Sequence, residues 1–95
     1  MNIQHEETGK GGRFFLHQDG KDLAEMSYVW AGDQRFIIDH TEVDSSLEGK
    51  GVGKALVTTA VEFAREKGVL ILPLCPYAKK VIERTPEFQD VVFKS

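Results

Sequence analysis

The spacing of hydrophobic residues changes near the middle of the chain. Before residue 44, apolar side chains alternate with polar ones, which is typical of half-buried strands. This alternation predicts strands at residues 14–16, 23–30 and 35–43. The dipeptides Asp19-Gly20 and Gly32-Asp33 separate them and suit tight turns. The first half of the chain is therefore predicted to be a three-stranded antiparallel meander.

Alternation in the third strand also assigns its residues to faces. His40 is expected on the same face as Phe36 and Ile38, and Asp39 on the opposite face with Thr41. Because imidazole exchanges a proton near neutral pH, His40 is a candidate general base. The alternative is a histidine that braces the sheet through a hydrogen bond to a loop.

After residue 51 the apolar spacing becomes helical. Val52, Leu56, Ala60 and Phe63 recur every three or four residues, and Gly68 is placed to end the helix. The following apolar run at residues 69–72 is too short for a helix and predicts a strand covered on both faces.

Two prolines bound a second helix. Pro76, preceded by Cys75, suits the first helical position, and Thr85-Pro86 ends the segment. Residues 91–93 are expected to add a short edge strand, whereas the polar residues 1–12 are expected to form a flexible N-terminus. The order βββαβα predicts one α+β domain over residues 13–95.

Composition narrows the function classes. The net charge of −3 argues against a general nucleic-acid binder, and no stretch is long and apolar enough to span a membrane. A single cysteine, Cys75, cannot form an internal disulfide. The sequence therefore indicates a cytoplasmic protein, with a monomer favoured.

The glycine-rich segment Gly49-Lys50-Gly51-Val52-Gly53 precedes the first helix and predicts an anion site. Free amides at a helix N-terminus and the helix dipole both favour a bound phosphate, and Lys50 and Lys54 add positive charge. A nucleotide-hydrolase P-loop is excluded, because only three residues separate Gly49 from Gly53 and Ala55 replaces the expected Ser or Thr. The dinucleotide-binding fingerprint is also excluded, because it needs a third glycine three residues after the second. Lys54 or Leu56 occupies that position, depending on which two glycines are taken as the first pair. A flexible connecting loop remains the alternative.

Three segments in order resemble a known family. The segments are Asp39-His40-Thr41-Glu42-Val43, residues 48–54 with Gly51-x-Gly53, and Pro73-Leu74-Cys75-Pro76-Tyr77. They are similar to the minimal, YjdJ-type family of GNAT-like acetyltransferases over roughly residues 14–90. Glu48 departs from the family pattern, which has Gln or Arg at this position.

The resemblance implies acetyl-CoA as co-substrate, without a metal. The pantetheine arm would lie between two diverging parallel strands, at residues 35–43 and 69–74, and a backbone N–H near Val43 would stabilise the oxyanion. The implied coenzyme contacts are Val43, Glu48, Gly49, Lys50, Gly51, Val52, Gly53, Lys54, Cys75, Lys79 and Lys80.

The resemblance also gives roles to two residues of the second helix. Cys75 would cap the helix near the acetyl group, as a nucleophile, an acid or base, or a lining residue. Tyr77 would protonate the departing thiolate. Their alternatives are an inert buried thiol and a packing aromatic side chain.

The sequence therefore predicts an N-acetyltransferase whose acceptor is a small-molecule or protein amine. The rival interpretation is a non-catalytic module that binds or senses acyl-CoA.

Overall fold

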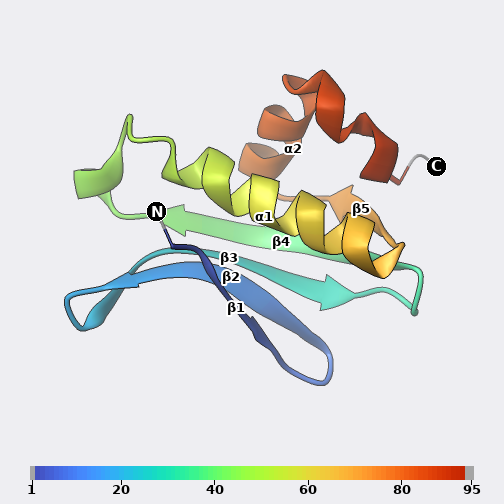
Figure 1. Cartoon of the computed structure of the whole chain (residues 1–95), viewed down its shortest axis with the longest axis horizontal. Helices are drawn as coiled ribbons and strands as arrows, with labels where there is room; N and C mark the ends of the chain where they lie inside the picture. The colour runs from blue at the N-terminus through green and yellow to red at the C-terminus, as the bar shows by residue number, and fades with distance from the viewer. Residues whose placement is uncertain (1, 94–95) are drawn as a thin grey trace.

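The computed structural model describes residues 2–93, which form one mixed sheet and the helices packed on it (Figure 1). The elements are β1 (Gln4–Glu7), β2 (Gly11–Gln18), β3 (Lys21–Trp30), β4 (Arg35–Val43), η1 (Ser45–Leu47), α1 (Val52–Lys67), β5 (Leu70–Pro73), α2 (Pro76–Glu83) and η2 (Pro86–Val91), where η denotes a 3-10 helix.

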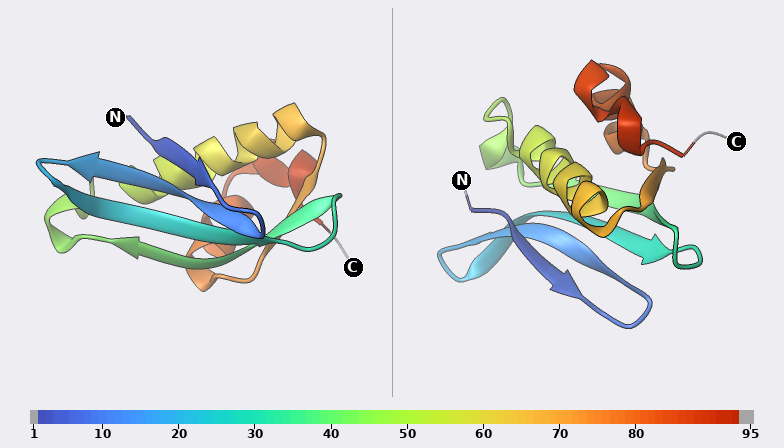
Figure 2. Two further views of the ribbon diagram at one scale, coloured as in Figure 1. Left: turned by 90° about the horizontal axis from the view of Figure 1, so that it is seen from below. Right: turned by 45° about the vertical axis from the view of Figure 1, so that its right-hand side comes forward.

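The strand order in the sheet follows the chain, β1-β2-β3-β4-β5. Strands β1 to β4 pair antiparallel, and β5 pairs parallel to β4 after the α1 crossover. Helix α1 runs along one face of the sheet, and α2 and η2 lie beside it near β5 (Figure 1 and Figure 2). The α+β class predicted from the sequence is confirmed.

A single core lies between the sheet and α1. The alternating residues of β3, Ala24, Met26 and Tyr28, are buried against the helical positions Leu56 and Ala60. The apolar face of the strand, which repeats every second residue, packs against the apolar face of the helix, which repeats every three or four residues. Helix α1 ends as predicted at Gly68, whose amide donates to carbonyls of the last turn and whose φ of 69° suits glycine.

The N-terminal prediction is corrected by the structure. Residues 4–7 form a fourth antiparallel strand, β1, where a flexible segment over 1–12 was expected, and β2 begins already at Gly11. All four β1 residues are exposed, so no alternation marked them as a strand. Met1, Lys94 and Ser95, at the ends of the predicted segment and domain, lie outside the described residues.

His5 attaches β1 to the rest of the sheet. Its Nε2 lies 2.6 Å from the Tyr28 hydroxyl, and its ring stacks on Phe14 with 4.3 Å between centroids. Burial lowers the pKa of His5, and burial raises the pKa of Tyr28 to about 12. Burial therefore favours the neutral forms of both groups.

The predicted C-terminal edge strand is also corrected. Pro86 opens η2, as proline favours a first helical position, and η2 extends to Val91. Val92 then makes only an isolated parallel bridge to Ile71, with the Phe93 amide 2.8 Å from the Ile71 carbonyl.

Candidate functional site

Strands β4 and β5 separate halfway along β4. They pair only as far as Ile38 opposite Pro73, and the Ile38 carbonyl then accepts hydrogen bonds from the amides of Leu74 and Cys75 at 3.1 and 3.0 Å. Residues 39–43 of β4 continue without a β5 partner within the described chain. The predicted parallel pair that diverges at its C-terminal ends is confirmed.

A β-bulge at Asp39 changes which face the rest of β4 presents. In the β3–β4 register Tyr28 lies opposite Ile38 but Ser27 lies opposite His40, so Asp39 is the extra residue. The predicted faces are therefore wrong beyond Ile38. Thr41, which lies opposite buried Met26, is on the helix-covered face, and His40 is on the outer face.

The open edge of β4 carries backbone groups without a strand partner. The Asp44 amide donates to the Leu23 carbonyl on the β3 side at 2.8 Å. Because hydrogen-bonding directions alternate along an antiparallel strand, the N–H and C=O groups of Thr41 and Val43 point to the side that β5 has left. This edge can accept an extended ligand in the manner of an added strand.

A pocket of about 450 Å³ lies between this edge and the glycine turn. It combines apolar walls with the start of α1. It is lined by Thr41, Val43, Leu47, Glu48, Gly49, Gly51, Val52, Gly53 and Tyr77. The sequence did not single out Thr41 or Leu47, because the bulge that turns Thr41 inward has no glycine or proline to mark it.

The glycine turn presents free amides to the pocket. Gly51 is the N-cap of α1 with a φ of 74°, a left-handed conformation that a side chain would strain. The first helical hydrogen bond runs from the Ala55 amide to the Gly51 carbonyl at 3.0 Å. The amides of Val52, Gly53 and Lys54 precede it and have no acceptor among residues 2–93. Free amides at a helix start are the geometry that the predicted anion site requires.

Gly53 has a second role that the sequence did not reveal. A Cβ atom at this position would lie 2.6 Å from Cε2 of Tyr77 and closer still to its hydroxyl. The Tyr77 ring, 43% exposed, therefore lies against the first turn of α1 and joins α2 to the pocket wall. Gly53 is needed for this contact, and not only for the approach of an anion.

Cys75 lies behind the pocket. It is the predicted N-cap residue of α2, but its side chain does not cap the helix. The thiol, in a residue only 6% exposed, instead donates to the Thr41 hydroxyl with 3.2 Å between Sγ and Oγ1. Cys75 is not among the residues that line the pocket.

The predicted basic contacts are divided between different surfaces. Lys50 and Lys54 are exposed beside the glycine turn, and Lys80 lies one turn after Tyr77 on α2. Lys79 instead borders a mostly apolar groove with Leu74 and Phe93. The structure therefore does not bring Lys79 to the pocket.

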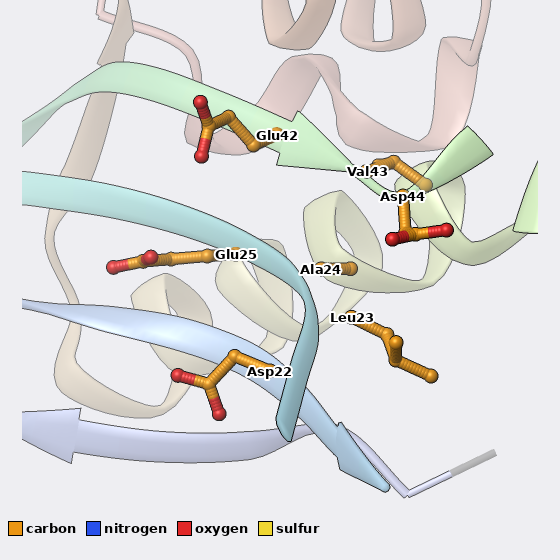
Figure 3. A pocket seen from close by; sticks show the side chains of 7 residues that line it. All are labelled: Asp22, Leu23, Ala24, Glu25, Glu42, Val43 and Asp44. Atoms are coloured by element: carbon orange, nitrogen blue, oxygen red, sulfur yellow. The ribbon is translucent and has the colours of Figure 1, made fainter. Parts of the chain in front are cut away.

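The outer face of the sheet carries the other candidate, His40. Its Nε2 lies 3.4 Å from Glu42 Oε1, and both side chains are well exposed. Nearby, four carboxylates surround a shallow pocket of about 390 Å³ (Figure 3): Asp22, Glu25, Glu42 and Asp44. A hydrogen bond from the Ser46 amide lowers the pKa of Asp44.

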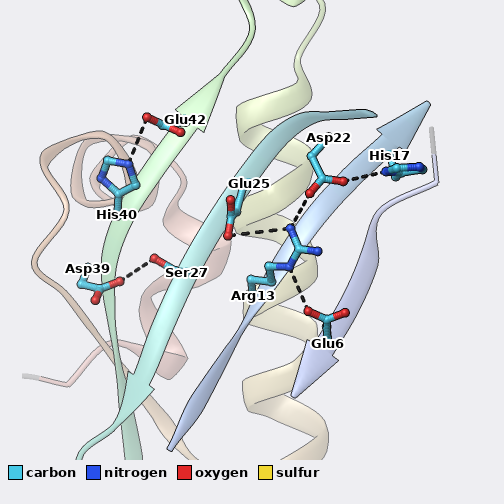
Figure 4. Close-up of polar contacts among 9 residues, drawn as sticks. All are labelled: Glu6, Arg13, His17, Asp22, Glu25, Ser27, Asp39, His40 and Glu42. Atoms are coloured by element: carbon cyan, nitrogen blue, oxygen red, sulfur yellow. Dashed lines mark hydrogen bonds and ion pairs between the residues drawn. The ribbon is translucent and has the colours of Figure 1, made fainter. Parts of the chain in front are cut away.

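Arg13 links three strands on this same outer face (Figure 4). Its guanidinium contacts Asp22 at 2.7 Å and Glu6 at 3.1 Å, and lies 3.9 Å from the centre of the Phe15 ring. The hydrogen bond from Arg13 lowers the pKa of Asp22. Figure 4 shows the helices behind the sheet, so His40 and the Arg13 contacts lie on the side away from the glycine turn.

Residues 2–93 contain no group of three or more His, Cys, Asp or Glu side chains placed to hold a metal ion. None of the helices in this range is long and apolar enough to cross a membrane.

Comparison with known proteins adds to this geometry. The family model of GCN5-related N-acetyltransferases matches residues 13–91. The chain belongs to this family. The broad family indicated by the resemblance of the three segments is thus confirmed, and the narrower YjdJ-type subgroup stays a prediction.

Individual proteins similar to this chain support the same assignment. Protein NATD1 of Xenopus tropicalis is 28% identical over 86 residues, which cover 90% of this chain and 79% of that protein. A GCN5-like protein of Staphylococcus aureus, solved by NMR, superposes with a TM-score of 0.76 at 33% identity, over 99% of this chain and 91% of that one. The ribosomal-protein-S18-alanine N-acetyltransferase of Escherichia coli has a TM-score of 0.67 at 20% identity. The match covers 82% of this chain and 53% of that enzyme, and it shows likeness of fold.

Proposed function

We propose that this protein transfers the acetyl group of acetyl-CoA to an amine. One observation carries the proposal: the free amides at the start of α1 and the open edge of β4 border the same pocket. The first suits the pyrophosphate of coenzyme A, and the second suits its amide-containing pantetheine arm.

The pyrophosphate would be held mainly by backbone groups. Each hydrogen bond from the amides of Val52, Gly53 and Lys54 to a phosphate oxygen contributes about 1.5–3 kcal/mol. The side chains of Lys50 and Lys54 add a weaker, salt-dependent attraction because both are exposed. The glycine turn is therefore the anchor of the bound coenzyme.

The acetyl group would lie where β4 and β5 separate. An amine nitrogen attacks the thioester carbonyl carbon, and the developing oxyanion accepts a hydrogen bond from the Val43 amide on the open edge. Collapse of the intermediate breaks the carbon–sulfur bond and releases the coenzyme thiolate. Tyr77 is placed in the same pocket wall to donate toward it.

The acceptor is proposed to be an amine of a small molecule or a protein. His40 and Glu42 lie on the outer face of β4, at the stretch where β5 has left the sheet. An amine approaching from that side would pass them before it reached the thioester. The monomeric state and the cytoplasmic location expected from the sequence stay predictions of this proposal.

One observation favours a non-catalytic acyl-CoA-binding module as the second candidate. Glu48 lines the pocket beside the amides that would bind pyrophosphate. A carboxylate there repels an anion, where the family pattern has a neutral or basic side chain. A weakly bound coenzyme without turnover would fit this alternative.

The test measures binding and transfer separately. Coenzyme A is titrated into the labelled protein, and we expect amide NMR shifts at residues 49–54. Lys54→Ala should weaken binding, whereas Lys67→Ala, at the other end of α1, should not. Acetyl-CoA is then incubated with a mixed amine panel and the products are read by mass spectrometry. Binding without any acetylated amine would support the module, and no binding at millimolar coenzyme would refute both candidates.

A further inference from the structure

The Thr41 side chain borders the pocket and also contacts the Cys75 thiol. Thr41 lines the pocket, whereas Cys75 does not, and the thiol is hydrogen-bonded to the Thr41 hydroxyl at 3.2 Å. A ligand in the pocket therefore meets the threonine before the thiol. Direct attack by Cys75 on a bound thioester would first require this contact to break.

The hydrogen bond with Cys75 also bears on the direction of the Thr41 hydroxyl hydrogen. A hydroxyl has one hydrogen to donate and two lone pairs to accept with. With the Cys75 thiol donating to one lone pair, the Thr41 hydrogen can point away from the sulfur of Cys75. Apart from Cys75 Sγ, no acceptor for it is present within residues 2–93, and its cross-strand neighbour on β3 is the apolar side chain of Met26.

Few other side chains of the pocket could donate a hydrogen bond. Val43, Leu47 and Val52 are apolar, and the remaining lining residues apart from Tyr77 are glycines and Glu48. Tyr77 lies against Gly53, at the start of α1. Thr41 lies on the open stretch of β4, so its hydroxyl and that of Tyr77 are the two side-chain hydroxyls that border the expected position of the thioester sulfur.

We infer that the Thr41 hydroxyl donates a hydrogen bond to the sulfur of bound coenzyme A, and that Cys75 is a positioning residue that orients this hydroxyl. This inference rests on the proposed function and adds to it a group that touches the leaving atom.

The step balances without another reactant. The amine nitrogen forms a bond to the acetyl carbon, the carbon–sulfur bond breaks, and the sulfur keeps that electron pair as a thiolate. The proton lost by the amine passes to solvent. The Thr41 hydrogen bond stabilises the thiolate more than the neutral thioester sulfur, because a hydrogen bond to a charged acceptor is the stronger one.

The experiment follows the ionisation of bound coenzyme A, which does not require turnover. Coenzyme A is bound to the intact protein, and its thiolate is titrated with pH by ultraviolet absorbance, with the unliganded protein subtracted. In the wild type we expect about tenfold more thiolate than in free coenzyme at the same pH. Thr41→Val should remove this difference and Thr41→Ser should keep it, while Cys75→Ala should reduce it. Thr59→Val, which deletes a part-buried hydroxyl bonded within α1, should leave it unchanged.

The acetylation rate provides the second measurement. Thr41→Val should lower kcat about tenfold with little change in KM for acetyl-CoA, and Thr41→Ser should recover most of kcat. Thermal unfolding and amide spectra establish that each variant is folded. A Thr41→Val protein that binds coenzyme A with an unshifted thiolate titration would overturn the inference and leave the proposed function standing. Acetylated Cys75 forming fast enough to lie on the pathway would also overturn it. Absence of coenzyme binding to the wild type would overturn the proposed function and this inference with it.

Discussion

Replacement of Gly53 by alanine isolates the contact between the two helix starts. The added methyl group would overlap the Tyr77 ring, which is exposed enough to swing away. A ring that buries about 200 Å² when fully covered buries roughly 110 Å² here because Tyr77 is 43% exposed, and losing about half of this area costs about 1.4 kcal/mol at 25 cal/mol per Å². Alanine in place of glycine in a helix returns about 0.5–1 kcal/mol. The two effects nearly cancel.

We therefore expect Gly53→Ala to change the melting temperature by only a few degrees while it displaces Tyr77 from the pocket. The assay is a double-mutant cycle with Tyr77→Ala, measured by thermal unfolding and by coenzyme A affinity. In the Tyr77→Ala background the same glycine substitution should be clearly stabilising, because no ring remains to be displaced. Equal effects of Gly53→Ala in both backgrounds would refute the contact.

Three further predictions concern the coenzyme anchor and the pH dependence of the sheet. Gly51→Val strains the left-handed N-cap and should weaken coenzyme A at least tenfold, about 1.4 kcal/mol, by calorimetry; unchanged affinity would mean that the pyrophosphate binds elsewhere. Because burial lowers the pKa of His5, its contribution is present above the ordinary value of 6.5 and is lost as pH falls below it. Protection of the β1 amides from hydrogen exchange should then fall in acid for wild type but not for His5→Phe. An equal loss of protection in both proteins would contradict protonation of His5 as the cause. The pKa of Asp22 is lowered mainly by Arg13, so this carboxylate stabilises the fold above its ordinary value of 3.8 and ceases to do so as pH falls through the lowered one. Arg13→Gln should reduce the loss of unfolding free energy at acid pH, measured by chemical denaturation at a series of pH values. A pH dependence identical to that of wild type would exclude the Arg13–Asp22 pair as the cause.

The sequence predicted those elements whose apolar spacing is regular. Helix α1 has its buried positions three or four residues apart and a glycine at each end, so its bounds followed from residue types alone. Asp19 and Gly20 both have positive φ values, 51° and 81°, as the hairpin turn requires. In these segments local preference and tertiary packing agree.

Prediction failed where tertiary contacts decide the structure. Strand β1 has no buried stripe of its own: besides its pairing with β2 and the Glu6–Arg13 contact, the imidazole of His5 joins it to an aromatic cluster more than eight residues away in sequence. The bulge at Asp39 results from a pairing register that no residue type announces. That register moved His40 to the outer face and Thr41 into the pocket, so the site differed from the predicted one although the glycine turn was in place.

The bulge also marks the boundary between two parts of β4, one where substitutions affect folding and one where they affect ligand binding. Residues 36–38 of β4 pair on both sides and include the core residues Phe36 and Ile38, so changes there act on folding. Beyond the extra residue, positions 40–43 have a neighbour on one side only, and substitutions at these positions are expected to act on ligands more than on stability. Because β5 diverges after Ile38 and the bulge follows at Asp39, β4 divides into a first part that serves the core and a second part that borders the pocket. Acceptor preference could then drift among related chains while the melting temperature stays nearly constant.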